Sequence, residues 1–249
     1  MPLLFLDYAA DLARRIAARS PRRVLEIAAG TGVVTRALTA TLPRDVSIVA
    51  TDLQPSMIET ASAIGTSRPV EWREADAMQL PFADSSFDAV VCQFGCMFFP
   101  DKAHAFAEAR RVLRPGGALL FNTWDALEEN DFSNITTISL ASIFPNDPPR
   151  LFPRAPYAYY DPTTIERDVT GGGFPRPQIE TLAGTSRAPS ARDAAIGLCQ
   201  GTPLRGEIEE RAPGRLGEIT DLVADAIAQR FGRGPVDGKI QALVVTVER

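Results

Sequence analysis

The sequence has few of the residues that build metal centres and disulfide frameworks. Its 249 residues include one histidine, His104, and three cysteines, Cys92, Cys96 and Cys199. A single histidine argues against a histidine-based metal centre, and the cysteine spacings fit neither a disulfide framework nor a zinc site. We therefore expect no metal ion in this protein.

Long apolar runs and basic clusters are also missing. The apolar stretch at residues 1–6 is too short for a signal peptide, and no stretch is long enough to span a bilayer. The net charge of -5 and the absence of any Lys/Arg run longer than a pair argue against general nucleic-acid binding. The sequence thus predicts a cytoplasmic protein without a nucleic-acid partner, and it leaves the oligomeric state open. Its arginine-rich, lysine-poor composition suggests a bacterial source.

Strand and helix patterns alternate through the first half of the chain. With 45% hydrophobic residues, the chain can bury one substantial core. Helical periodicity over 8–19 is followed by expected strands at 24–28, 46–51, 70–74, 88–93 and 118–123, with helices at 32–41, 55–63 and 101–113 and a turn at 114–117. This alternation predicts a doubly wound, mostly parallel α/β sheet that binds ligands at the carboxyl ends of its strands.

The pattern changes after Trp124. We expect helices at 132–144, 163–171, 190–200 and 205–231, and strands at 177–187 and 240–248. Asp161 and Pro162 are typical of the start of the second of these helices. We interpret 125–160 and 190–235 as a small helical cover over the site of a single domain, residues 1–249; surface decoration is the alternative.

The glycine-rich turn at 28–32 identifies the kind of ligand. It follows an apolar strand, and Asp52 comes about twenty residues after it, the distance at which an acid meets a ribose. A dinucleotide fingerprint needs a third glycine where this chain has Thr35. Glu26, just before the turn, would repel a pyrophosphate but suits a ligand amine. S-adenosylmethionine fits this pattern better than NAD, which remains the alternative.

Several further motifs continue the pattern along roughly residues 20–125. In order, they are Val24-Leu25-Glu26-Ile27-Ala28-Ala29-Gly30-Thr31-Gly32, Thr51-Asp52-Leu53-Gln54-Pro55-Ser56-Met57, Ala75-Asp76-Ala77-Met78-Gln79-Leu80-Pro81-Phe82, Ser86-Phe87-Asp88-Ala89-Val90 and Arg111-Val112-Leu113-Arg114-Pro115-Gly116-Gly117. This half of the chain resembles the class I S-adenosylmethionine-dependent methyltransferases, in the small-molecule subgroup with ubiquinone and menaquinone methyltransferases. The sequence departs at Ala28, where many members have glycine.

The resemblance implies a fold, a cofactor and a set of residues that bind it. The fold is a Rossmann-like seven-stranded sheet, mostly parallel, with its last strand antiparallel. The cofactor is S-adenosylmethionine, and the residues expected to line it are Glu26, Ala28, Gly30, Gly32, Asp52, Leu53, Met57, Asp76, Ala77 and Gln93. Among them, Glu26 would receive the cofactor amine, Asp52 the ribose hydroxyls and Asp76 the adenine amino group.

Each of the main assignments has a structural alternative. Asp52 can cap the helix that follows it, and Asp76 can be a simple turn residue. Glu26 can brace the loop through backbone amides. Leu53 and Met57 can be plain core residues.

The acceptor pocket is expected to form from the N-terminal helix, the loop after the fourth strand, Trp124 and the two cover segments. Its candidate residues are Tyr8, Phe94, Met97, Trp124 and Tyr157, which favour a flat or lipophilic small acceptor. We expect catalysis by positioning, with His104 exposed or at a helix cap, and the sequence leaves the catalytic residues and the use of a general base open. An NAD-dependent oxidoreductase and a non-catalytic protein that binds S-adenosylmethionine are the alternatives.

Overall fold

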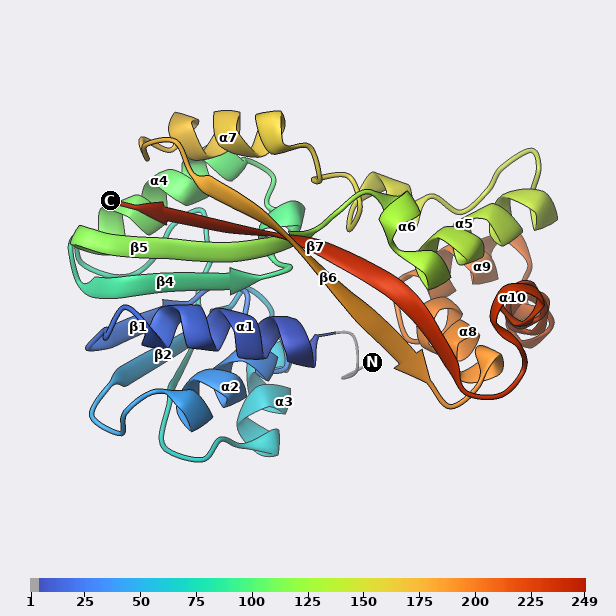
Figure 1. Cartoon of the computed structure of the whole chain (residues 1–249), viewed down its shortest axis with the longest axis horizontal. Coiled ribbons are helices and arrows are strands. Elements are labelled where there is room, and N and C mark those ends of the chain that lie inside the picture. The colour runs from blue at the N-terminus through green and yellow to red at the C-terminus, as the bar shows by residue number, and fades with distance from the viewer. Residues whose placement is uncertain (1–4) are drawn as a thin grey trace. The chain divides into compact units, whose positions relative to one another are not determined.

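The computed structural model describes residues 5–249 as two compact units (Figure 1). The sheet unit consists of Phe5–Thr123, Tyr160–Thr181 and Leu243–Arg249. The helical unit consists of Trp124–Tyr159 and Leu182–Ala242. No helix within the described residues is long and apolar enough to cross a membrane.

Seven strands form one sheet in the order β3-β2-β1-β4-β5-β7-β6. Their bounds are β1 (Arg23–Glu26), β2 (Ser47–Asp52), β3 (Glu71–Glu74), β4 (Phe87–Gln93), β5 (Leu113–Trp124), β6 (Gln178–Ala188) and β7 (Val236–Glu248). The pairs β1/β2, β1/β4, β2/β3 and β4/β5 are parallel. The predicted seven-stranded, mostly parallel sheet is confirmed.

β7 runs antiparallel to β5. Gly116 N donates to Arg249 O at 3.0 Å, whereas Asp125 N, nine residues later in the chain, donates to Gln241 O at 3.0 Å. As the residue number rises along β5, the number of its hydrogen-bonded partner in β7 falls, which is the antiparallel pattern. The prediction that the last strand is antiparallel is confirmed.

The predicted turn at 114–117 is wrong, because these residues belong to β5. The register between β4 and β5 shifts between Phe87 and Ala89, and Gly116 adopts φ 78°. The Pro-Gly-Gly sequence therefore forms an irregularity inside a strand instead of a loop before it.

Helices pack on the sheet within the sheet unit. They are α1 (Leu6–Ala17), α2 (Val33–Thr41), α3 (Pro55–Ile64), α4 (Lys102–Val112) and α7 (Pro162–Gly171). α1 packs against α2 and α4 against α7, on opposite sides of the sheet (Figure 1). The central strands are therefore buried on both faces, as their continuous apolar runs require. Asp161 caps α7 as predicted, accepting from Thr164 N at 2.9 Å.

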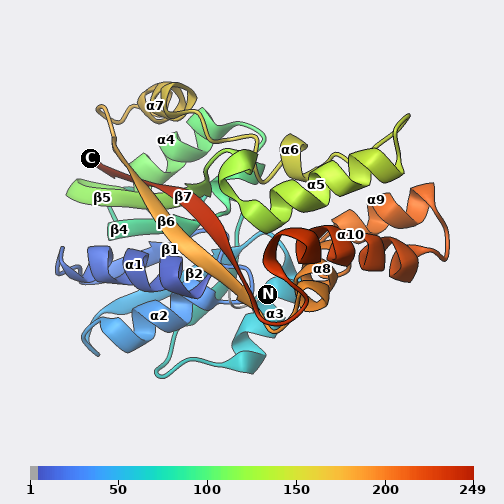
Figure 2. The same cartoon turned by 45° about the vertical axis from the view of Figure 1, so that its right-hand side comes forward.

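The helical unit contains the remaining helices (Figure 2). They are α5 (Asp131–Ile143), α6 (Leu151–Arg154), α8 (Ala191–Cys199), α9 (Leu204–Arg211) and α10 (Leu216–Phe231), and α10 packs against both α8 and α5. The predicted continuous helix at 205–231 is wrong. The chain breaks at Pro213-Gly214, where Gly214 adopts φ 75°. Proline lacks the amide and glycine allows the left-handed turn, so the helix ends there.

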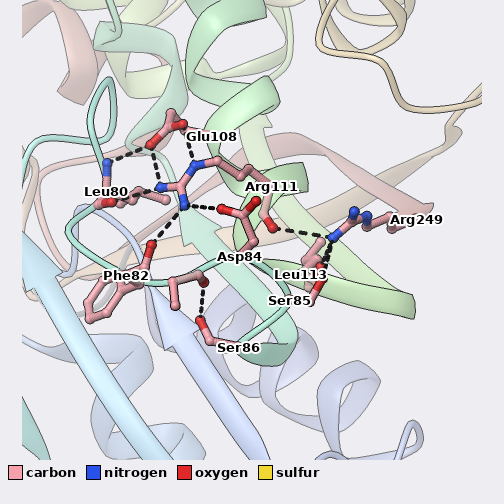
Figure 3. Close-up of polar contacts among 10 residues, drawn as sticks. Leu80, Phe82, Asp84, Ser85, Ser86, Glu108, Arg111, Leu113 and Arg249 are labelled. Carbon is pink, nitrogen blue, oxygen red and sulfur yellow. Dashed lines mark hydrogen bonds and ion pairs between the residues drawn. The ribbon is translucent and has the colours of Figure 1, made fainter.

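One arginine connects two of the sequence motifs within the sheet unit. The Arg111 guanidinium donates to the carbonyls of Leu80 and Phe82, each at 2.8 Å, and to the carboxylates of Glu108 and Asp84 (Figure 3). Glu108 also accepts from Leu80 N at 2.8 Å. The loop between β3 and β4 is therefore fixed to α4 by a fork of hydrogen bonds.

We expect Arg111→Ala to lower the free energy of unfolding by about 2–3 kcal/mol, because two loop carbonyls and two carboxylates lose their donor. Urea unfolding measures this loss. Arg111→Lys keeps the charge but not the planar fork, so it should recover only part of the stability. An alanine variant as stable as the parent would contradict this role.

Candidate functional site

The turn between β1 and α2 has an unusual backbone. Ala28, Gly30 and Gly32 adopt φ values of 54°, 55° and 80°, all in the left-handed region. A Cβ on Gly32 would lie 3.0 Å from the Trp72 ring, whereas a Cβ on Gly30 would meet nothing within 4 Å. Gly32 therefore permits close packing, and Gly30 presents bare backbone to open space that a ligand can occupy.

Asp52 lies at the end of β2 and faces this turn. One carboxylate oxygen, Oδ2, accepts from Gly30 N at 2.8 Å, and Oδ1 accepts from Gln54 N at 2.9 Å. The residue is buried, with 9% of its surface exposed. A carboxylate has about four acceptor positions, so two remain for ligand hydroxyls. Asp52 therefore fixes the loop and also keeps acceptor positions free for the ribose hydroxyls that the sequence predicts as its ligands.

Glu26 is fully buried at the end of β1. Its Oε2 accepts from the Thr35 hydroxyl at 2.6 Å. Burial raises the pKa of the Glu26 carboxyl to about 8, although the hydrogen bonds from Thr35 oppose this shift. Glu26 thus braces the first turn of α2 through Thr35. Thr35, which stands where a dinucleotide fingerprint has glycine, is its partner.

The raised pKa of Glu26 predicts a pH-dependent stability. The folded protein keeps this proton up to about pH 8, whereas the unfolded chain loses it above about pH 4.5, so the free energy of unfolding should fall between these values by about 4–5 kcal/mol. Urea unfolding at a series of pH values, compared with Glu26→Gln, isolates this contribution. If the free energies of unfolding of the parent and Glu26→Gln differ by the same amount at every pH from 5 to 8, this contribution is contradicted.

The residues predicted to meet an adenine flank Asp52. Leu53 and Met57 are 56% and 40% exposed, which excludes the alternative that they are core residues. Asp76 forms a turn, its Oδ1 accepting from Met78 N at 2.8 Å, while Ala77 is buried. Asp76 thus forms a turn with one oxygen, and its second oxygen accepts no hydrogen bond from the described residues.

His104 supports this turn from outside. Its Nε2 lies 2.9 Å from Met78 O, and its backbone amide donates to the capping residue Asp101 at 2.9 Å. The ring is exposed. His104 therefore has the structural role that the sequence predicted.

The end of β4 and the segment after it pack near the glycine turn. Gln93 Nε2 donates to Phe5 O at 3.3 Å, and Gln93 Oε1 is buried without a hydrogen-bond partner among the described residues. A Cβ on Gly95 would lie 2.5 Å from the Ala28 Cβ. The departure from the family at Ala28 is thus accommodated by a glycine at residue 95.

The predicted acceptor residues lie in both units. In the sheet unit, Tyr8 packs edge-on against Phe94, with ring centroids 5.4 Å apart, and Met97 is buried. In the helical unit, Trp124 stacks on Tyr157 with ring centroids 6.0 Å apart. The structure therefore forms two aromatic groups from these residues, one in each unit.

Three residues that contribute to this arrangement are absent from the sequence-based assignment. Thr35 binds Glu26, Gly95 packs against Ala28, and Ser133 Oγ lies 2.7 Å from Tyr157 Oη. No local pattern reveals such pairs, because their members are brought together by folding.

The strand order and the glycine turn define a Rossmann-like sheet, which can now be compared with known proteins. Residues 25–121 match the family model described as a methyltransferase domain. The similarity to this family thus covers residues 25–121 of the chain.

Relatives of known name match less than half of the chain. The demethylmenaquinone methyltransferase of Deinococcus radiodurans is 44% identical over 105 residues, which are 41% of this chain and 43% of that protein. The one from Thermus thermophilus is 39% identical over 123 residues, 46% of this chain and 56% of that protein. The match thus spans about half the length of these relatives.

Solved structures match almost the whole chain in fold. A putative methyltransferase from Bacillus halodurans has a TM-score of 0.62 and 23% identity, covering 96% of this chain and 97% of that one. The YcgJ protein of Bacillus subtilis has a TM-score of 0.61 and 21% identity, covering 98% of this chain and 99% of that one. At these identities the likeness concerns the fold alone.

Proposed function

We propose that this protein binds S-adenosylmethionine and transfers its methyl group to a small organic acceptor. The observation that carries the proposal is the contact between Asp52 and the Gly30 amide, which places a carboxylate beside the open backbone of the glycine turn. The methyltransferase domain at residues 25–121 supports the same function.

The residues around the turn fit the parts of this cofactor. Asp52 has acceptor capacity for the ribose hydroxyls, and the exposed side chains of Leu53 and Met57 offer an apolar surface for the adenine. Asp76 and the Ala77 amide would hold the adenine edge. Ala28, Gly30 and Gly32 would line the methionine part, with Glu26 at its amine. The Oε1 of Gln93, which has no hydrogen-bond partner among the described residues, would lie nearby.

The chain's own contribution to the reaction is to bind, to orient and to exclude water. When bound, S-adenosylmethionine supplies a methyl group on a sulfonium, a good leaving group for in-line displacement by an acceptor. Holding the acceptor in line at near-attack distance is then the main source of acceleration. His104 is held at the Met78 carbonyl and supplies no base in this proposal.

Two experiments distinguish this proposal from two other functions. Calorimetry with S-adenosylmethionine, S-adenosylhomocysteine and NAD separates a methyltransferase from an NAD-dependent oxidoreductase. Binding of NAD with no response to either sulfur compound would overturn the proposal. A non-catalytic protein would bind both sulfur compounds and methylate nothing in an acceptor screen.

The role of Glu26 toward the cofactor amine has its own test. An ammonium group beside Glu26 would favour the carboxylate, so binding at pH 7 should release up to about one proton from a group whose pKa is about 8 in the free protein. Calorimetry in buffers of different ionisation enthalpy measures this release. Glu26→Gln should remove it; the same release from that variant would place the amine elsewhere.

The proposal also covers the methyl acceptor, the kind of partner and the cellular location of the protein. The candidate acceptor residues are Tyr8, Phe94, Met97, Trp124 and Tyr157. The named relatives make demethylmenaquinone the first compound to screen.

The net charge of -5 supports a small molecule over a nucleic acid as partner. Three buried free cysteines fit the reducing cytoplasm.

A further inference from the structure

The helical unit contains a pocket of its own, with a volume of about 220 Å³. Its walls include the aromatic rings of Trp124, Phe132 and Tyr157, and its polar lining includes Ser133, Ser186 and Asp193. Every lining residue belongs to the helical unit. The pocket is therefore a property of this unit by itself, and it lies outside the segment that matches the methyltransferase family.

The aromatic residues of this pocket are buried and mutually fixed. Trp124 and Tyr157 are 6% and 8% exposed, and their rings stack at an interplanar angle of 30°. Phe152 packs edge-on against Tyr157, with ring centroids 5.9 Å apart. Flat aromatic walls held in this way suit a flat aromatic guest, which gains from stacking as well as from burial. An apolar cavity of about 150 Å³ is large enough for benzene, so the present volume admits a larger ring system.

The polar atoms deep in the pocket are neutral hydroxyls. Ser133 Oγ and Tyr157 Oη share one hydrogen bond at 2.7 Å, which uses one of their two O–H donors. The pair therefore keeps one donor and several lone pairs for an oxygen atom of a ligand. Burial raises the pKa of Tyr157 to about 12, so this hydroxyl remains protonated at neutral pH.

The charged residues are confined to the rim and already have partners. Arg187 is exposed and pairs with Asp237 at 3.6 Å. Asp193 is also exposed and accepts from Ser190 Oγ at 2.6 Å. No charged side chain of the lining is buried, so a charged group in the interior would have no counter-ion and would pay its full desolvation cost.

We infer that this pocket binds an uncharged, flat aromatic ring bearing a hydroxyl or carbonyl oxygen, with the ring against Trp124 and Tyr157 and the oxygen at the Ser133–Tyr157 pair. The inference rests on the proposed function in one respect, namely that this ring is part of the methyl acceptor. Binding itself does not depend on methyl transfer.

The chain offers a variant that fills the pocket without disturbing the fold. Gly197 of α8 lines the pocket, and a Cβ built on it meets nothing within 4 Å. Gly217 of α10 is equally unobstructed but does not line the pocket. Leucine at either position also improves helix propensity, so both variants are expected to fold. Gly217→Leu is the matched control for Gly197→Leu.

The test is calorimetry of 2-naphthol binding to the full chain, with naphthalene and 2-naphthoate as comparison probes. We expect 2-naphthol to bind the parent and Gly217→Leu equally, and Gly197→Leu at least tenfold more weakly. Tyr157→Phe should weaken binding by about three- to tenfold, the loss of one hydrogen bond. Naphthalene and 2-naphthoate should each bind more weakly than 2-naphthol. Equal binding of 2-naphthol to Gly197→Leu would overturn the inference.

Methyl transfer distinguishes this failure from failure of the proposed function. If 2-naphthol binds as expected but no acceptor is ever methylated, the pocket stands and the proposed function fails. If an acceptor is methylated at the same kcat/KM by the parent and by Gly197→Leu, the proposed function stands and the pocket does not hold the acceptor. A kcat/KM lowered in Gly197→Leu but not in Gly217→Leu supports both.

Discussion

Replacing Gly95 by alanine is expected to lower the free energy of unfolding by about 2–3 kcal/mol, the cost of overpacking a well-packed site. The added Cβ would lie 2.5 Å from the Ala28 Cβ and 2.9 Å from Cys92 Sγ. The backbone of Gly95 has φ -97° and ψ -40°, which alanine adopts freely, so the cost is steric. Because Ala28 belongs to the glycine turn, the same change should weaken binding of S-adenosylmethionine.

A second substitution makes this prediction specific. In an Ala28→Gly background the closest obstructing atom is absent, so Gly95→Ala should cost at least about 1 kcal/mol less than it does in the parent. Gly116→Ala is the control, since it is strained by its φ of 78° but meets nothing within 4 Å, and its cost should be the same in both backgrounds. Urea unfolding of the double-mutant cycle measures the coupling. No coupling between positions 28 and 95 would show that the turn and the segment after β4 pack independently.

Asp52→Ala is expected to weaken binding of S-adenosylmethionine by about 1–3 kcal/mol, the range for hydrogen bonds to a charged group. Two effects add. The ribose would lose its acceptor, and the Gly30 amide would lose the 2.8 Å bond that holds the turn. Titration calorimetry gives the change in Kd.

Asp52→Asn separates these two effects. The amide keeps one oxygen that can accept from the Gly30 N–H, so the turn should stay in place while the charge and half of the acceptor capacity are lost. An intermediate affinity is expected. An affinity unchanged in both variants would move the ribose away from Asp52.

The sequence predicted those parts of the fold that local pattern determines. Buried parallel strands such as β2 and β4 have short apolar runs at their centres, and Asp161 before Pro162 begins α7 as its residue types require. The helix predicted over 205–231 failed because apolar periodicity extends across Pro213-Gly214. The proline and glycine indicated a helix end at this point, but the prediction gave more weight to the apolar periodicity on either side.

The candidate site shows a different limit. The spacing of Gly30 and Asp52 predicted two residues that the structure joins by a hydrogen bond. The buried pair of Glu26 and Thr35 has partners nine residues apart, and the contact between Ala28 and Gly95 joins residues in different motifs. Such contacts depend on how strands pair and where loops cross, which a single sequence does not encode in any local period.

The strand order has a consequence for how this protein can diverge. β6 and β7 are neighbours in the sheet although residues 189–235 separate them in the chain. That intervening segment, which carries α8, α9 and α10, thus leaves and re-enters the sheet between adjacent strands. A segment inserted in this way can be lengthened, shortened or exchanged with little effect on the strands that bound it. Evolution can in this way change the helices, and with them the pocket, while the sheet and its glycine turn are inherited unchanged.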